Sequence, residues 1–208
     1  SSQLGFDIAP NTINSIERKK KRIDIISWER ITNEIVKILK SDKPSIGLYL
    51  LRDTGLLDII LPEFSIMGGV EIKNKMGHKD VFIHTLQVID NAAKLTNKMR
   101  IRFAALVHDI AKPQTKKFLT GKGWSYHGHE VLGIKLMKKL SEKMRLSNEL
   151  TGYLCKLIKL HLRPISLAKD GVTDSAVRRL MVEAGEDIDD LMILCRADVT
   201  TKNPKKVK

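Results

Sequence analysis

The chain has 208 residues, of which 42% are hydrophobic and 5% aromatic, and 37 Lys and Arg stand against 24 Asp and Glu. This composition predicts one large domain or two small ones with an aliphatic core. No signal peptide or 18-residue apolar run points to secretion or a membrane. The formal net charge of +13 favours nucleic acid as a partner, although general solubility would also explain it. With Cys155 and Cys195 alone and no CxxC pattern, nothing indicates a disulfide framework or a zinc knuckle, and we expect a cytoplasmic protein.

The first 66 residues are expected to form a small helical unit. Apolar periodicity, with Pro and Gly at the expected ends, predicts helices over residues 11–22, 28–39, 46–54 and 56–60. Residues 65–80 contain several glycines and few apolar residues in register, which predicts a loop or linker. We therefore place the domain boundary in that segment.

The second unit, residues 77–208, is expected to be an all-α helical bundle with one short β-hairpin. The apolar pattern predicts helices over residues 81–95, 101–111, 129–144, 148–162, 173–184 and 187–200. Two β-like runs, residues 117–119 and 124–126, flank Thr120–Gly123 and predict the hairpin.

Residues 101–112 are apolar almost all round, so a helix over this segment belongs in the middle of a core. His108 and Asp109 lie side by side within it, and burying both is costly unless each has a partner. A divalent metal is one such partner, because it binds imidazole and carboxylate together. A buried, hydrogen-bonded His–Asp pair is the other interpretation, and the dipeptide alone does not decide between them.

All six histidines lie in the second unit. Four of them fall on different predicted helices or at helix ends, and one aspartate on the last helix joins the set: His84, His108, His129, His161 and Asp198. Bundles build metal sites in their cores from ligands on several packed helices, so this set predicts a metal site. The two remaining histidines stand in loops and are expected at the surface or behind the ligands: His78 and His127.

The order His…His-Asp…Asp is present as His84, His108-Asp109 and Asp198, and it resembles the HD-domain superfamily of metal-dependent phosphohydrolases. The resemblance implies that these four residues hold one divalent ion. In some members two further histidines complete a second site, bridged here by the first aspartate, and they stand in this chain as His129 and His161. The mixed donor set suits Mn, Fe, Ni, Co or Zn better than Mg, with one or two ions bound.

A bound divalent ion lowers the pKa of its water toward neutrality, and the hydroxide formed can attack a phosphate ester. Because Asp109 would hold that ion, we expect it to be a catalytic residue. Lys112 lies one helical turn beyond Asp109, so we expect it to face the same cavity as a catalytic residue that holds a phosphate oxygen. A lysine that snorkels from a helix end is the alternative. Arg163, two residues past His161, is a second candidate for the substrate phosphate.

Longer segments carry a closer resemblance: Gly77–His84, Ala105–Pro113, Gly123–Glu130, Leu160–Pro164, Thr173–Arg179 and Cys195–Asp198. They are similar to the HD region of bacterial tRNA nucleotidyltransferases, the CCA-adding enzymes of the poly(A) polymerase family. Pro44–Gly47 and Thr54–Leu57 resemble the helical RNA-binding neck of that family, so residues 1–66 are called the neck below. The resemblance implies tRNA or another RNA as partner, with candidate contacts at Lys19, Lys20, Lys21, Arg22, Arg30, Arg178 and Arg179.

One departure from the family concerns nucleotide addition. The family adds nucleotides with an N-terminal head that contains a Gly-Gly turn and paired aspartates. Here Gly68-Gly69 is not followed by that pattern, and Asp187-Ile188-Asp189 lies in a helical context. Because the chain begins with Ser1 rather than Met, we expect a neck truncated at its N-terminus. We also expect a fragment that does not polymerise, from a parent that adds nucleotides to tRNA 3′ ends.

Three functions follow as hypotheses. The first is a tRNA-binding unit with a divalent-metal phosphohydrolase site for 2′,3′-cyclic phosphates, 2′-nucleotides or phosphate at RNA ends. The second is a non-catalytic module that clamps tRNA and contains a structural metal, which the basic charge favours. The third is a stand-alone HD enzyme acting on free nucleotides, and the neck-like first unit argues against it.

Overall fold

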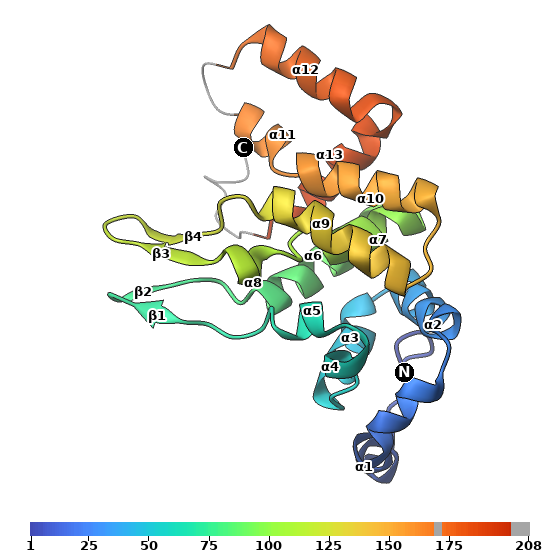
Figure 1. Ribbon diagram of the computed structural model, residues 1–208. Helices are drawn as coiled ribbons and strands as arrows, with labels where there is room; N and C mark the ends of the chain where they lie inside the picture. Colours follow the sequence, from blue (N-terminus) through green and yellow to red (C-terminus); the bar gives the residue numbers. More distant parts are fainter. Residues whose placement is uncertain (169–171, 201–208) are drawn as a thin grey trace.

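A computed structural model describes residues 1–168 and 172–200 of the chain. Within these residues the chain is mainly helical with two small antiparallel hairpins, which confirms the all-α class (Figure 1). The neck contains a 3₁₀ helix at Lys20–Ile25 and the helices α1 (Pro10–Lys19), α2 (Trp28–Lys40), α3 (Pro44–Asp53), α4 (Leu57–Ile60) and α5 (Pro62–Ser65). None of the helices in the described part of the chain is long and apolar enough to cross a bilayer.

The second unit is a bundle of longer helices joined by short ones. Its helices are α6 (Val81–Leu95), α7 (Met99–Val107), α8 (Lys112–Thr115), α9 (His129–Lys143), α10 (Asn148–Leu160), α11 (Arg163–Leu167), α12 (Asp174–Ala184) and α13 (Ile188–Asp198). The predicted long helices are present with ends shifted by a few residues, because each has a clear apolar face or a capping residue. Asp80 caps α6 by accepting a hydrogen bond from the Ile83 amide, and Ser147 caps α10 in the same way. Helix α11 was not predicted.

Helix α7 lies at the centre of the bundle and packs against α2, α6, α10 and α13. Residues 101–111 are all buried, as the apolar composition of this segment predicts. The helix nevertheless ends at Val107, four residues earlier than expected, and tight turns lead into α8. Pro113 explains the early end, since its ring would clash with the carbonyl of Asp109 in a continuous helix. His108 and Asp109 therefore lie at a break in the backbone.

A β-hairpin within residues 65–80 corrects the expectation of a loop in that segment. Strands β1 (Ile72–Lys73) and β2 (Met76–Gly77) pair across a two-residue turn, in which Asn74 and Lys75 have φ values of 51° and 63°. Such a turn usually carries Asn-Gly, and the lysine in the second position hid the signal. The predicted hairpin is present as β3 (Lys117–Leu119) paired with β4 (Gly123–Ser125).

The two hairpins lie side by side and project from the same side of the bundle (Figure 1). The Trp124 indole nitrogen of β4 donates a hydrogen bond of 2.9 Å to the Met76 carbonyl of β2. Lys116 pairs with Glu71, and the Lys73 ammonium lies 5.2 Å from the centre of the Phe118 ring. These contacts hold both hairpins as one projection above the end of the bundle.

The neck and the bundle share one continuous apolar core. Ile35 and Leu39 of α2 belong to the same buried cluster as Phe103 of α7 and Ile89 of α6. Polar contacts reinforce this packing: both carboxylate oxygens of Asp90 accept hydrogen bonds from Ser45, one from its amide and one from its hydroxyl. Because the core crosses the proposed boundary between the two units, the position of that boundary stays a prediction.

Candidate metal centre

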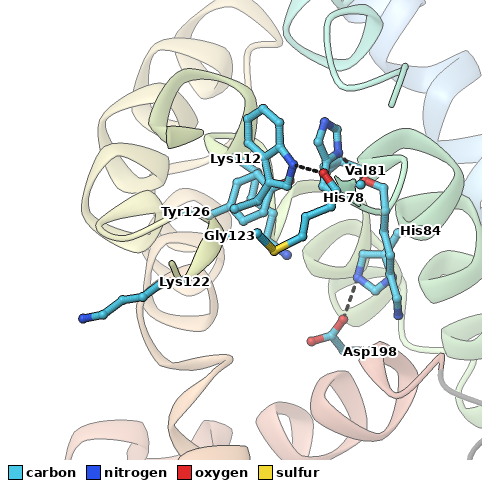
Figure 2. A pocket seen from close by; sticks show the side chains of 12 residues that line it. His78, Val81, His84, Lys112, Lys122, Gly123, Tyr126 and Asp198 are labelled. Carbon is cyan, nitrogen blue, oxygen red and sulfur yellow. Dashed lines mark hydrogen bonds and ion pairs between the residues drawn. The ribbon is translucent and has the colours of Figure 1, made fainter. Parts of the chain in front are cut away.

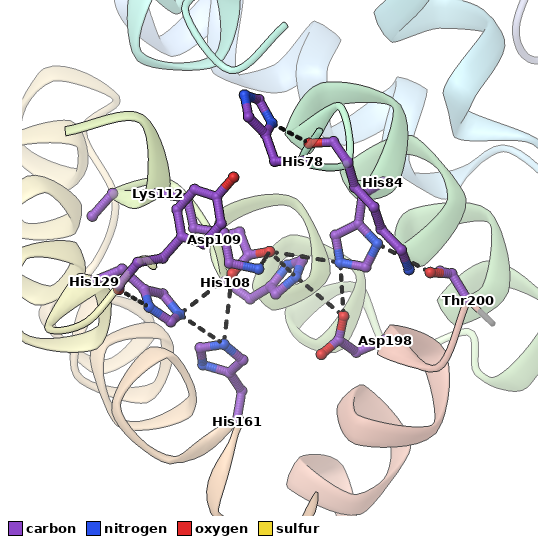
Figure 3. A network of polar contacts seen from close by, with 12 residues as sticks. His78, His84, His108, Asp109, Lys112, His129, His161, Asp198 and Thr200 are labelled. Atoms are coloured by element: carbon purple, nitrogen blue, oxygen red, sulfur yellow. Dashed lines mark hydrogen bonds and ion pairs between the residues drawn. The ribbon is translucent and has the colours of Figure 1, made fainter. Parts of the chain in front are cut away.

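Helix ends bring the predicted ligands to one place. His108 and His161 directly follow the last residues of α7 and α10, His129 is the first residue of α9, and Asp198 is the last residue of α13. His84 lies in the first turns of α6. The structure therefore brings all six predicted ligands together at one end of the bundle, with the Asp109 carboxylate among them (Figure 3).

The first ligand group comprises His84, His108, Asp109 and Asp198. The Nε2 atom of His84 lies 2.9 Å from Asp198 Oδ1 and 3.6 Å from Asp109 Oδ2. The Nε2 atom of His108 lies 3.1 Å from Asp109 Oδ2 and 3.5 Å from Asp198 Oδ1. Two imidazoles and two carboxylates thus converge on a space that a single divalent ion could occupy.

The second ligand group comprises Asp109, His129 and His161. Here the other carboxylate oxygen, Asp109 Oδ1, lies 3.5 Å from His129 Nε2 and 3.7 Å from His161 Nε2. The two Nε2 atoms are 3.4 Å apart. Asp109 therefore presents one oxygen to each group, so it would be a ligand of both if each group held an ion.

The hydrogen bonds of the Nδ1 atoms fix which nitrogen of each histidine faces the centre. In three rings Nδ1 lies 2.8–2.9 Å from the backbone carbonyl three residues earlier: His108 to Ala105, His129 to Tyr126, and His161 to Ile158. A carbonyl only accepts, so Nδ1 carries the proton and Nε2 of the neutral ring keeps its lone pair for a metal.

The fourth ring, His84, has its Nδ1 atom 3.2 Å from the Thr200 hydroxyl. Sequence reasoning missed this threonine, because no local pattern connects residues 116 positions apart. It also missed the carbonyl partners of the other three rings. Their common spacing of three residues is visible only once the helix ends are known.

Buried polar atoms without hydrogen-bond partners indicate whether the ligand groups suit a metal ion. Among the described residues, His108 Nε2 and Asp109 Oδ1 are buried side-chain atoms without a hydrogen-bond partner. Leaving a buried polar group unpaired costs about 1–3 kcal/mol, so a native structure rarely tolerates two such atoms side by side. Both atoms point into the ligand groups, and their lone pairs are those a divalent cation would take. The residues present therefore fit a metal site.

The charges at the centre agree with that fit. Burial opposes a charge on His108, but Asp109 and Asp198 outweigh it and raise the pKa of this imidazole to about 10. The pKa of the Asp109 carboxyl stays well below its usual range, because His108 and Lys112 outweigh its burial. Burial dominates at His129 and lowers the pKa of this ring. The carboxylates thus favour a positive charge at this place, and a divalent ion supplies it as well as a proton does.

Lys112 lies in the same cavity as the ligands. It is the first residue of α8, and its ammonium is 2.5 Å from Asp109 Oδ2. A pocket of about 530 Å³ opens from His84, Asp198 and Lys112 toward the two hairpins, where Tyr126 and Trp124 line it. Figure 2 shows Lys112 and Tyr126 on one side of this pocket and His84 with Asp198 on the other. We call it the hairpin pocket.

The remaining histidines hold no place among the ligands. His78 lines the hairpin pocket, donates from Nδ1 to the Lys79 carbonyl and accepts at Nε2 from the Glu71 amide. Both of its nitrogens are therefore occupied in holding the first hairpin. His127 is exposed. That neither residue is a ligand stays a prediction.

Arg163 lines neither the ligand groups nor the hairpin pocket. It is the first residue of α11, and its guanidinium pairs with Glu183 of α12. It lines a different cavity of about 800 Å³, together with Arg178 and Arg179. The contact of Arg163 with a substrate phosphate therefore stays a prediction, and the structure shows the side chain paired with Glu183.

The basic residues proposed for RNA occupy two ends of the molecule. Lys19, Lys21 and Arg22 are exposed and Lys20 is half-buried on α1 and the following 3₁₀ helix. The pair on α12, Arg178 and Arg179, is exposed at the opposite end (Figure 1). Arg30 is exposed on α2.

Comparison with protein families matches both units. Residues 81–203 match the HD domain. Residues 5–67 match the family described as "Probable RNA and SrmB- binding site of polymerase A". The two matches together cover most of the chain.

Comparison with individual proteins finds relatives that are longer than this chain. The chain is 35% identical over 162 residues to the "Multifunctional CCA protein" of Psychromonas ingrahamii, covering 76% of this chain and 39% of that protein. It is 31% identical over 204 residues to the protein of the same name from Vibrio campbellii, covering 95% of this chain and 49% of the relative. The chain thus spans about half or less of the relatives it matches. It belongs to the HD-domain family, and in front of that domain it carries the RNA-binding neck of the CCA-adding and poly(A) polymerase family.

Proposed function

We propose that the metal centre is a phosphohydrolase site for nucleotide phosphates, such as 2′,3′-cyclic phosphates, 2′-nucleotides or phosphate at an RNA end. The observation that carries the proposal is Asp109, whose two carboxylate oxygens face two separate histidine groups beside an open pocket. A purely structural metal would be enclosed on all sides, whereas this centre borders the hairpin pocket.

Each residue has a defined part in this proposal. The first ligand group would hold one ion and the second group another, and Asp109 would be a ligand in both groups. A bound divalent ion supplies Lewis acidity and a water of lowered pKa. Mn, Ni, Co, Fe and Zn suit a set of four imidazoles better than Mg does. Lys112 holds a phosphate oxygen, since its ammonium already lies beside Asp109 at the mouth of the pocket.

For the whole protein we propose a role in processing tRNA 3′ ends in the cytoplasm. The support is the name of its relatives, Multifunctional CCA protein, together with the RNA-binding neck and the charge of +13. In this proposal the parent protein adds nucleotides to tRNA, and the part described here binds the tRNA.

A tRNA-clamping module with a structural metal is the second candidate. The placement of basic residues at opposite ends of the molecule favours it, since an RNA touching both α1 and α12 must extend along the whole molecule. The two candidates are compatible, because the hairpin pocket and the basic ends do not share residues.

The test is hydrolysis of a 2′,3′-cyclic nucleotide by the purified chain with added manganese or nickel. We expect metal-dependent turnover that Asp109→Asn abolishes and that Asp42→Asn, at an exposed aspartate between α2 and α3, does not change. If the chain binds metal but turns over none of the proposed substrates, the hydrolase proposal is wrong and the clamping module is the better account.

A further inference from the structure

The hairpin pocket is larger than the phosphate group that the metal centre needs to accommodate. Its volume of about 530 Å³ falls in the range of sites for small organic ligands. One end is formed by His84, Asp198 and Lys112, and the other by residues of the two hairpins. A substrate with its phosphate at the centre would therefore place the group bonded to that phosphate against the hairpins.

One polar atom in the pocket has no role in the fold. The Tyr126 hydroxyl oxygen is buried and finds no hydrogen-bond partner among the residues that the structure describes. The Tyr126 ring lines the pocket, and the Lys112 ammonium lies 5.7 Å from its centre (Figure 2). The backbone of the same residue is engaged, since its carbonyl accepts the hydrogen bond from His129. The buried hydroxyl thus keeps unused hydrogen-bonding capacity beside the pocket.

Three aromatic rings, those of His78, Trp124 and Tyr126, line the hairpin end of the pocket. The rings of His78 and Trp124 meet edge to face with centroids 5.0 Å apart, and His78 meets Tyr126 in the same way at 6.3 Å. Hydrogen bonds hold the rings: Trp124 donates to the Met76 carbonyl, and both nitrogens of His78 are engaged. Rings held in this way suit a flat heterocycle, because aromatic surfaces bind nucleobases with little dependence on sequence.

We propose that the hairpin pocket is the nucleoside subsite of the metal centre, with the Tyr126 hydroxyl as its hydrogen-bonding group and Trp124 as part of its aromatic wall. The ligand class is a nucleotide whose phosphate lies beside Lys112, either free or at the end of an RNA. This inference rests on the proposed function, since that function places the phosphate at the centre. In this proposal the β1–β2 hairpin, which the sequence did not predict, contributes Met76 and His78 to the wall of the subsite.

Binding can be measured without turnover by the fluorescence of Trp124. The chain has two tryptophans, and Trp28 lies on α2 in the neck, so Trp28→Phe leaves the pocket tryptophan as the only one. In the presence of a chelator we expect adenosine and adenosine 2′-monophosphate to quench this variant saturably, and inorganic phosphate to leave it unchanged. The matched variant Trp124→Phe should show no quenching. Quenching of Trp28 alone, or none at all, overturns the subsite.

Substrate preference tests the hydroxyl. With manganese, the ratio of kcat/KM for 2′,3′-cyclic AMP to that for glycerol 1,2-cyclic phosphate should fall about tenfold in Tyr126→Phe, because that variant loses only the oxygen that contacts the nucleoside. Tyr49→Phe, at the exposed tyrosine of α3, should keep the ratio of the unaltered chain. An unchanged ratio in Tyr126→Phe overturns the proposal for this residue.

The two measurements separate this inference from the proposed function. Metal-dependent hydrolysis without preference for the nucleoside keeps the hydrolase and overturns the subsite. Saturable quenching by nucleotides without hydrolysis of any phosphate ester supports the subsite and overturns the hydrolase. A short RNA ending in a 2′,3′-cyclic phosphate, titrated beside the mononucleotide, identifies by its tighter quenching whether the ligand is an RNA end or a free nucleotide.

Discussion

Asp109 is the residue on which both ligand groups depend. It is fully buried, and its two oxygens face different sets of histidines. Each histidine, in contrast, offers Nε2 to one group, because Nδ1 is engaged outside the centre. Loss of the aspartate and loss of one histidine should therefore have different consequences for metal binding.

The first prediction compares Asp109→Asn with His161→Asn in metal titrations. Asp109→Asn removes a charge that both groups share, so the affinity of every bound ion should fall by at least about 100-fold. His161→Asn should weaken the second group and leave a single ion on the first. Isothermal titration with manganese or nickel measures both, and far-UV circular dichroism checks that each variant is folded. If Asp109→Asn and His161→Asn lost all bound ions to the same extent, the two ligand groups would not be separate metal sites.

Arg102 acts at the scale of whole elements, because it joins the ends of two helices. Its guanidinium is 3% exposed and donates to the Leu39 and Ser41 carbonyls at the end of α2, and to the Ala93 and Thr96 carbonyls at the end of α6. Within the described residues no carboxylate pairs with it. Helix C-termini favour a cation, so the two helix ends take the place of a counter-ion.

Replacing Arg102 should therefore destabilise the contact between the neck and the bundle. Arg102→Met removes the hydrogen-bond donor of four backbone carbonyls, two of them in buried hydrogen bonds, and we expect the free energy of unfolding to fall by about 3 kcal/mol. Arg102→Lys should recover only part of this loss, because lysine lacks the planar fork that reaches both helices. Urea denaturation gives the values, with Arg30→Met on the exposed face of α2 as the control within about 0.5 kcal/mol. A loss no larger than that of the control would show that the helix ends do not need this residue.

Asp190 forms a second buried link between elements. The residue lies on α13 and is 2% exposed; its oxygens contact Lys98 at 2.9 Å, Arg100 at 2.7 Å and the Tyr153 hydroxyl at 3.1 Å. Burial alone would raise the pKa of this carboxyl, but the hydrogen bonds from Lys98 and Tyr153 and the charge of Arg100 lower it overall. The ionised form of the Asp190 carboxylate therefore stabilises the folded state.

The sign of the pH dependence follows from that lowered pKa. The stabilisation by Asp190 is fully present above the pKa of about 4 in the unfolded chain, and it is lost as the pH falls through the lower pKa of the folded state. Asp190→Asn should reduce stability at pH 7 and flatten the acid limb of the stability curve. Thermal unfolding between pH 7 and pH 3 measures both effects. Asp189→Asn, at the exposed neighbour on the same helix, should leave the curve unchanged.

At the scale of the whole molecule, charge is distributed over both ends of one continuous core. Buried residues of the neck and of the bundle belong to one apolar core. The basic groups of α1 and α12 therefore lie on opposite ends of one packed structure. A polyanion that contacts both ends gains two separate sets of phosphate contacts. The affinity of the chain for such a polyanion should then fall steeply with salt concentration, because each neutralised phosphate releases counter-ions.

The RNA prediction removes charge at one end at a time. Paired alanine substitutions at Lys21 and Arg22, or at Arg178 and Arg179, should each reduce the slope of log affinity against log salt by about 2, one for each removed contact. Fluorescence anisotropy of labelled tRNA at several salt concentrations measures the slopes. If only one pair changes the slope, the RNA does not extend along the molecule, and if neither does, the clamping proposal is wrong.

Local patterns were sufficient for most helices and for one hairpin. Amphipathic periodicity and end residues are properties of a few consecutive positions, so the long helices and the β3–β4 pairing could be predicted from them. The early end of α7 at Val107 was predictable in principle from Pro113, whose clash reaches back four residues. The β1–β2 hairpin was not, because its turn contains Asn74-Lys75 instead of a pair with glycine.

The sequence by itself determined which types of side chain, histidine and aspartate, form the centre. Histidines and aspartates in a fixed order on apolar helices require a buried partner, and their order already resembles the HD superfamily. The tertiary structure decided which oxygen of Asp109 faces which histidines, that Arg163 turns to Glu183, and that the Tyr126 hydroxyl is left without a partner. Each of these depends on atoms from segments distant in the chain meeting within a few ångströms, and the packing of the helices, not their local periodicity, determines those distances.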